Sequence, residues 1–139
     1  MPGTHIWPAL SYPAWRDIAV TLQLWTQVVG KVRLALTPWV NHSWQVPLDV
    51  TARGLGTSPI EHDRRTFDVE FDFIDHNLVF RASDGQTHAL ALIPRAVADF
   101  YHEVMRVLDA MGLAVSIYDK PVEVPDPVPF PEDRRHAAY

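Results

Sequence analysis

Hydrophobic residues recur at helical spacing along the chain that follows Pro13. Steps of three and four residues place side chains on one face of a helix. Pro13 suits a first helical turn, and Thr37-Pro38 ends the pattern. We therefore predict a long helix over residues 13–36 that lies across a sheet, with contact to a second chain through its wide apolar face as an alternative. The stripe consists of Trp15, Ile18, Leu22, Trp25, Val29, Val32 and Leu36.

The hydrophobic pattern then changes to a period of two, which is typical of strands with one buried face. Asp84-Gly85 separates the last two alternating stretches and is a good hairpin turn. The predicted strands are residues 44–52, 67–73, 78–82 and 86–92.

A second helical stripe starts near Pro94 and stops at Gly112, a residue suited to a helix C-terminus. Residues 113–118 are short and apolar, which predicts a last strand. The expected fold class is α+β. It comprises a long N-terminal helix, a four-strand antiparallel meander, a second helix and a final short strand, with the helices on one sheet face.

Residues 120–139 differ in composition, because five prolines between 121 and 131 alternate with acidic residues. Regular proline favours an extended chain. We predict a single α+β domain over residues 1–119 and a Pro-rich strap or linker over residues 120–139. Val122, Val124, Val128 and Phe130 would dock the strap on an apolar groove, either of its own domain or of a partner copy.

Composition narrows the class of protein. The chain has 139 residues, 47% of them hydrophobic, and no cysteine, so it is long enough for one domain with a core and cannot be a disulfide scaffold. A net charge of −5 argues against a nucleic-acid binder. The N-terminus has no basic region followed by a long apolar run, and no stretch is apolar enough for a membrane span. We expect a cytoplasmic protein without membrane contact.

Several strings together resemble an uncharacterised bacterial family, the one called domain of unknown function 5996. They are residues 25–36, 40–42, 50–55, 57–60, 71–76 and 97–101, and the likeness runs from Trp7 through Ala137. The resemblance implies that relatives are longer, with a second half beyond the strap, so that this chain is similar to their N-terminal half. A second copy or a similar domain would then replace the missing neighbour. The family name implies no activity, and no catalytic residue follows from it.

One candidate site lies on the predicted first helix, where Gln27 and Lys31 share a face. A small anionic or aromatic ligand would bind between this helix and the sheet, because arginine clamps carboxylates and Asn and His offer adaptable hydrogen bonds. The alternative is that basic residues near the helix end only complement its dipole. Whether the chain is an enzyme stays open. The candidate ligand-binding residues are Gln27, Lys31, Asn41, His42 and Arg53.

Three other patterns have a structural explanation that we favour. Asp72, Asp75 and His76 could bind a metal or act as acid and base, but Asp75-His76-Asn77 also suits a turn. Alternating acids over residues 68–72 could serve glycoside hydrolysis, but they suit a solvated sheet face. Residues 54–59 could hold a phosphate, but they lack the P-loop pattern and suit a loop that connects two strands. We expect neither a metal nor a cofactor.

The aromatic residues favour self-association. All five tryptophans lie within the first 44 residues, and tryptophan often anchors interfaces. Residues 1–60 carry a net charge of +2 (four basic, two acidic) and residues 61–119 carry −6 (five basic, eleven acidic), so two copies could attract each other. Our first hypothesis is therefore an α+β module that forms a homo-oligomer or pairs with a similar domain. The second is an enzyme or small-ligand binder. The candidate interface residues are Trp7, Trp39, Trp44 and Phe130.

Overall fold

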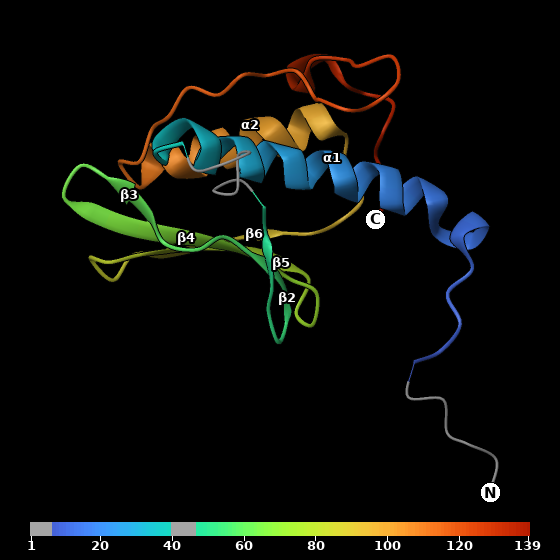
Figure 1. Cartoon of the computed structure of the whole chain (residues 1–139), viewed down its shortest axis with the longest axis horizontal. Coiled ribbons are helices and arrows are strands. Elements are labelled where there is room, and N and C mark those ends of the chain that lie inside the picture. Colours follow the sequence, from blue (N-terminus) through green and yellow to red (C-terminus); the bar gives the residue numbers. More distant parts are fainter. Residues whose placement is uncertain (1–6, 40–46) are drawn as a thin grey trace, which may run out of the picture.

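The computed structural model describes residues 7–39 and 47–139 and contains two α-helices against one antiparallel sheet (Figure 1). The fold class is α+β, as predicted, and both helices cover the same face of the sheet. The elements are α1 (Tyr12–Leu36), β1 (Asp49–Val50), β2 (Gly54–Gly56), β3 (Ile60–His62), β4 (Arg65–Asp72), β5 (Asn77–Ala82), β6 (Thr87–Ala91), α2 (Val97–Ala110) and a 3₁₀ turn, η2 (Phe130–Glu132).

Helix α1 begins and ends close to the predicted bounds. Pro13 lies in its first turn, where a missing N–H breaks no helical hydrogen bond. At the other end, the N–H of Thr37 donates to the Arg33 carbonyl at 2.9 Å and Pro38 follows. At 25 residues the helix is about 37 Å long. Its first turns extend beyond the body of the domain (Figure 1).

The sheet has the strand order β1-β2-β4-β5-β6, and β3 pairs with the part of β4 that β2 leaves free. Strands β4, β5 and β6 are three of the four strands of the predicted meander, with Phe71 opposite Leu78 and Leu78 opposite Leu90. Alternation turns Phe67, Val69 and Phe71 toward the helices, where they are buried. The alternating pattern in the sequence therefore identified the buried face of the central strand correctly.

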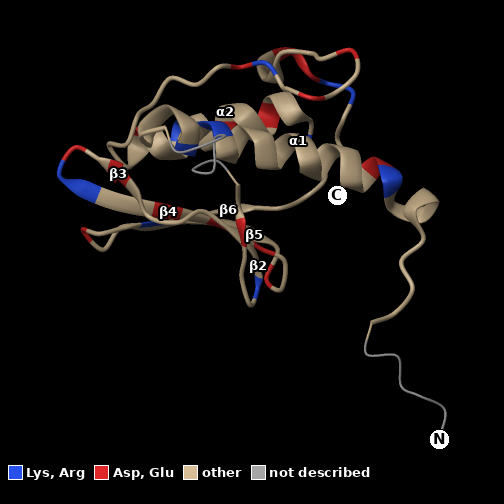
Figure 2. Cartoon of the chain, in the orientation of Figure 1, with Lys and Arg blue, Asp and Glu red and all other residues tan. Residues whose placement is uncertain are grey.

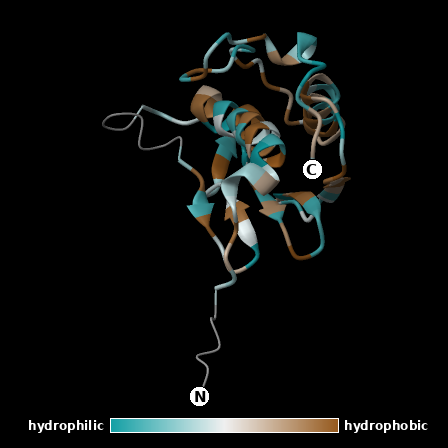
Figure 3. Ribbon diagram, turned by 90° about the vertical axis from the view of Figure 1, so that its right-hand side faces the viewer, coloured by the Kyte–Doolittle hydropathy of each residue, from teal (hydrophilic) through white to brown (hydrophobic). Residues whose placement is uncertain are grey.

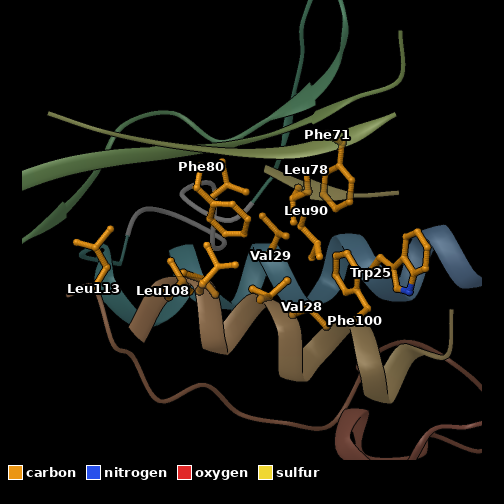
Figure 4. Close-up of a cluster of buried hydrophobic side chains, with 14 of the residues drawn as sticks. Trp25, Val28, Val29, Phe71, Leu78, Phe80, Leu90, Phe100, Leu108 and Leu113 are labelled. Atoms are coloured by element: carbon orange, nitrogen blue, oxygen red, sulfur yellow. The ribbon is translucent and has the colours of Figure 1, made fainter. Parts of the chain in front are cut away.

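The hydrophobic core lies between the sheet and the two helices (Figure 4). Trp25 of α1 stacks on Phe100 of α2 with ring centroids 4.6 Å apart, and the Phe71 ring lies 6.3 Å from that of Phe100. All three side chains are fully buried. This aromatic cluster joins α1, α2 and the sheet at one end of the core, and Leu108 and Leu113 fill the other end.

Helix α2 ends at the predicted glycine, because Gly112 adopts a positive φ of 72° that L side chains rarely adopt. Just beyond the helix, Arg65 donates to the carbonyls of Met111 at 2.8 Å and of Gly112 at 2.7 Å. A cation at this position also complements the negative end of the helix dipole. Arg65 therefore ties the start of β4 to the end of α2.

The Pro-rich strap forms a third layer outside the helices (Figure 3). Its Phe130 is fully buried and belongs to the hydrophobic core, so the strap packs on its own domain at this residue. Further on, the carbonyls of Asp133 and His136 accept the N–H groups of Ala98 and Val97 at 2.9 and 3.0 Å. Because Ala96 makes no side-chain cap at this helix start, the strap supplies its capping acceptors.

Three details of the sheet differ from the prediction. Residues 113–118 form no strand, because β3 already pairs with this edge of β4. They contact β3 through a side chain instead, since the His62 ring nitrogen lies 3.1 Å from the Ala114 carbonyl. Short strands β2 and β3 lie where a loop was expected. Of the predicted strand over residues 44–52, only β1 is a strand within the described part, and residues 44–46 lie outside it.

No helix in the part of the chain that the structure describes is long and apolar enough to cross a membrane.

Candidate functional site

A pocket of about 400 Å³ lies where α1 passes the β1–β2 edge of the sheet and the start of the strap. Its volume falls in the range of small-molecule sites. Most of the lining is apolar, with leucines from α1 and from both sides of the β1–β2 hairpin. The lining residues are Thr26, Gln27, Gly30, Lys31, Leu34, Leu48, Leu55 and Val122.

Lys31 is the charged residue of this pocket, and it is only 7% exposed. It belongs to the group of basic residues near the C-terminal end of α1 (Figure 2). Its ammonium lies 4.7 Å from the centroid of the Tyr118 ring, a distance at which a cation is attracted to the ring face. Among the residues described, none forms an ion pair with Lys31.

Burial lowers the pKa of Lys31 from its ordinary value, and the negative charge of Asp119 offsets this only in part. An ammonium that has left water without a carboxylate partner is unfavourable, and an anion placed beside it would restore its pKa. The pocket can therefore accept a negatively charged group at Lys31 while apolar atoms of the same ligand contact the leucines.

Gln27 is the second candidate ligand-binding residue that lines this pocket, and its side chain binds the strap. Its side-chain amide donates to the Val122 carbonyl at 2.9 Å and accepts the Val122 N–H at 2.9 Å. Both ends of the amide are therefore engaged by the backbone of one residue, as in a pair of neighbouring strands. Gln27 shapes the wall of the pocket by fixing Val122 there.

Arg53, which we expected beside Lys31, does not line this pocket. It lies just before β2, where its Nε donates to Asp72 at 2.6 Å and its terminal nitrogen lies 2.8 Å from Asp75. The hydrogen bond from Arg53 holds the pKa of Asp72 below its ordinary value, helped by the N–H groups of Asp75 and Ile74. A guanidinium between two carboxylates is already neutralised. Arg53 therefore stabilises the turn after β4 and does not contribute to the pocket.

The other predicted residues are scattered. Asn41, His42 and Trp44 lie outside the described residues. Trp7 and Trp39 are 85% and 68% exposed. Phe130 is buried inside its own chain and leaves no side-chain surface for a partner in this conformation.

Asp72 and His76, which we considered as metal ligands or as an acid and a base, have structural roles. Asp72 accepts the N–H groups of Ile74 and Asp75 at 2.9 and 3.1 Å and so closes the turn after β4. His76 is 2.5 Å from the Tyr139 hydroxyl rather than beside an acid. Within residues 7–39 and 47–139, no group of three or more metal-ligating side chains is placed to hold an ion.

The row of acids on β4 faces outward and is paired. Arg81 of β5 lies 3.3 Å from Asp68 and 3.1 Å from Glu70, which are its cross-strand neighbours. These acids are paired but only partly solvated, since Asp68 and Glu70 are half-buried and Asp72 is buried, so the solvated sheet face that we favoured holds only in part.

Sequence reasoning missed four side chains around Lys31, namely Leu48, Leu55, Tyr118 and Val122. The alternation of valines in the strap signalled that Val122 would dock, but not where. Leu55 lay in a stretch interpreted as a loop, and Tyr118 in one interpreted as a strand. Their convergence depends on how the strap folds back over α1.

Fold and pocket together define a small α+β domain with an antiparallel sheet, two helices on one face and one cationic apolar pocket. The chain belongs to a family of unknown function, DUF5996, whose model matches residues 7–139. No curated protein and no solved structure matches it.

Proposed function

We propose that this domain binds a small amphipathic anion, with the negative group at Lys31 and the apolar body against Leu34, Leu48 and Leu55. The observation that carries the proposal is a lysine 7% exposed in a largely apolar pocket of about 400 Å³, with no ion-pair partner among the described residues. Gln27 and Val122 form the wall on the strap side.

Desolvation of Lys31 favours an anionic ligand in this pocket. Lys31 loses hydration on folding, and the lowered pKa of its ammonium reflects this loss. A carboxylate or sulfonate in the pocket would add a charge-assisted hydrogen bond, and such bonds contribute about 1.5–3 kcal/mol. A neutral ligand of the same shape would lack this contribution. Lys31 is thus assigned a binding role, and the ligand class is an acid with an apolar body.

Two fluorescent probes test this assignment. Anilinonaphthalene sulfonate carries an anionic group, and phenylnaphthylamine has a similar aromatic body without it. Titration of the whole chain should show saturable binding of the sulfonate probe. Lys31→Met should weaken that binding about tenfold or more, with little effect on the neutral probe.

Lys120→Met is the matched control, because Lys120 is the other lysine of the chain and does not line the pocket. It should leave the affinity for the sulfonate probe unchanged. Equal affinity of the wild type and Lys31→Met for that probe would contradict the proposal. So would an equal loss for both probes in Lys31→Met, since the pocket would then select shape and not charge.

Self-association is a second candidate function, favoured by the exposed aromatic residues near the two ends of α1. Trp7 and Trp39 are 85% and 68% exposed, and Tyr12 in the first turn is 57% exposed. Aromatic residues so exposed are typical of interfaces that bury them against a partner. Sedimentation velocity at micromolar concentrations should show a mass above that of one chain. A monomer throughout would contradict this candidate.

A further inference from the structure

Strand β6 ends the sheet on one side, and its outer edge offers unpaired backbone groups. Gln86 and Leu92 bond inward, to Ala82 and His76 at 2.9 Å each. Because the bonding direction alternates along an antiparallel strand, the N–H and C=O groups of Thr87, Ala89 and Ala91 point outward.

Few of these outward groups have a partner. Among the described residues, the Ala91 carbonyl accepts from Arg95 at 3.0 Å, and nothing from outside the sheet bonds to the backbone of Thr87 or Ala89. The side chains of Thr87, Ala89 and Ala91 are small and exposed. The edge is therefore open along most of its length.

The opposite edge is built differently. Strand β1 has two residues, one of them the charged Asp49, and Pro47 precedes it. Short length, charge and proline are the features that prevent a sheet edge from pairing with another chain. Strand β6 has five residues and carries neither a proline nor an Asp, Glu, Lys or Arg. The β1 edge has features that prevent pairing with another chain and the β6 edge has none of them, which indicates that β6 is the edge that pairs.

We propose that β6 pairs antiparallel with β6 of a second copy of this chain, joining two sheets into one. This inference rests on the proposal above that the chain self-associates, and it locates the contact at the β6 edge instead of at the exposed aromatic residues near the two ends of α1. A two-fold axis at Ala89 places the two Ala89 residues opposite each other and Thr87 opposite Ala91. On the exposed face of the sheet, the side chains that meet in this register are those of Thr87, Ala89 and Ala91, which are all small.

Charge complementarity selects the second copy and the antiparallel direction. Asp84 lies five residues before Ala89 and Arg95 six residues after it. In the antiparallel pair, Asp84 of each copy approaches Arg95 of the other, whereas a parallel pair would place like charges together. Asp84 already pairs with Arg65 at 2.9 Å, so Arg95 would extend an existing ion pair.

An apolar contact lies beside these charges. Ile93, just beyond β6, is 49% exposed, and Gly85 in the hairpin turn has open space where a side chain would stand. The same register brings Ile93 of one copy over Gly85 of the other. The backbone edge, the charges and this contact therefore agree on one register.

Ala89→Lys tests the surface, because it places two ammonium groups opposite each other at the proposed axis without changing a buried position. In sedimentation velocity it should raise the dimer dissociation constant about tenfold relative to the wild type. Ala110→Lys, an equal charge change at an exposed alanine that ends α2, should leave the constant unchanged. Ala89→Pro is a second disrupting variant, since it removes an outward N–H that has no hydrogen-bond partner among the described residues.

Hydrogen exchange adds a residue-level measurement. The amides of Thr87 and Ala89 should become protected as the wild-type concentration rises, while the inward amides of His88 and Leu90 are protected at every concentration. A dimer that Ala89→Lys and Ala89→Pro leave intact would overturn the β6 assignment and keep self-association. A wild type that stays monomeric would overturn both.

Discussion

Replacing Phe130 with alanine should lower the free energy of unfolding by about 3–5 kcal/mol, the cost of truncating a buried phenylalanine. The Phe130 side chain is fully buried, and its ring stacks on Tyr101 with centroids 6.2 Å apart. An aromatic pair of this kind contributes about 0.5–1.5 kcal/mol beyond the buried area. The backbone N–H of Phe130 also donates to the Asp119 carbonyl at 2.7 Å, and an alanine at this position can keep that hydrogen bond. The loss therefore reports side-chain packing alone.

Equilibrium urea unfolding measures this loss directly when it is followed by tryptophan fluorescence, to which the buried Trp25 contributes. At about 2–4 °C per kcal/mol, the melting temperature should fall by about 10 °C. Val122→Ala is the control in the same strap, because the Val122 side chain is 51% exposed and its truncation should cost only about 0.5 kcal/mol. If Phe130→Ala stays within about 1 kcal/mol of the wild type, the strap does not unfold together with the domain and the reasoning fails.

Three further predictions follow from single positions. Gly54→Ala should cost more than about 2 kcal/mol in a urea titration, because its Cβ would stand 2.0 Å from the Phe71 carbonyl oxygen; an unchanged midpoint would contradict the close approach of β2 and β4. Burial lowers the pKa of Lys31 in the folded state, so stability should rise as the pH is raised through that pKa toward 10.5, and the rise should be missing in Lys31→Met. Hydrogen bonds from Gln86 lower the pKa of Asp84 to about 2, so stability should fall as the pH drops from about 3.8 toward 2, with a shallower fall in Asp84→Asn.

The helices and the central strands could be predicted because their signals are local. The apolar stripe of α1 and the alternation around Phe71 each depend on residues that are neighbours in the sequence. Pro38 and Gly112 end the two helices for equally local reasons, the first by steric exclusion and the second through its positive φ.

The rest of the fold depends on contacts between distant segments. Strands β2 and β3 are too short to show a period, and they form because β4 offers both of them one long edge. Arg53 and Lys31 looked like equal candidates for one site, but Asp72 holds Arg53 elsewhere. Tyr118 approaches Lys31 only because the chain folds back after α2, which no periodicity in the sequence encodes.

The cap that the strap places on α2 has a consequence for folding during synthesis. The first N–H groups of α2 bond to carbonyls of Asp133 and His136, residues that the ribosome adds more than thirty positions later. Until they emerge, the nascent chain has a helix start without these acceptors and a core that lacks Phe130. Such a chain exposes apolar surface and depends on long-range closure, which is slow. We expect this domain to complete folding only after residue 136 has left the ribosome, and earlier lengths of the nascent chain to be substrates for chaperones.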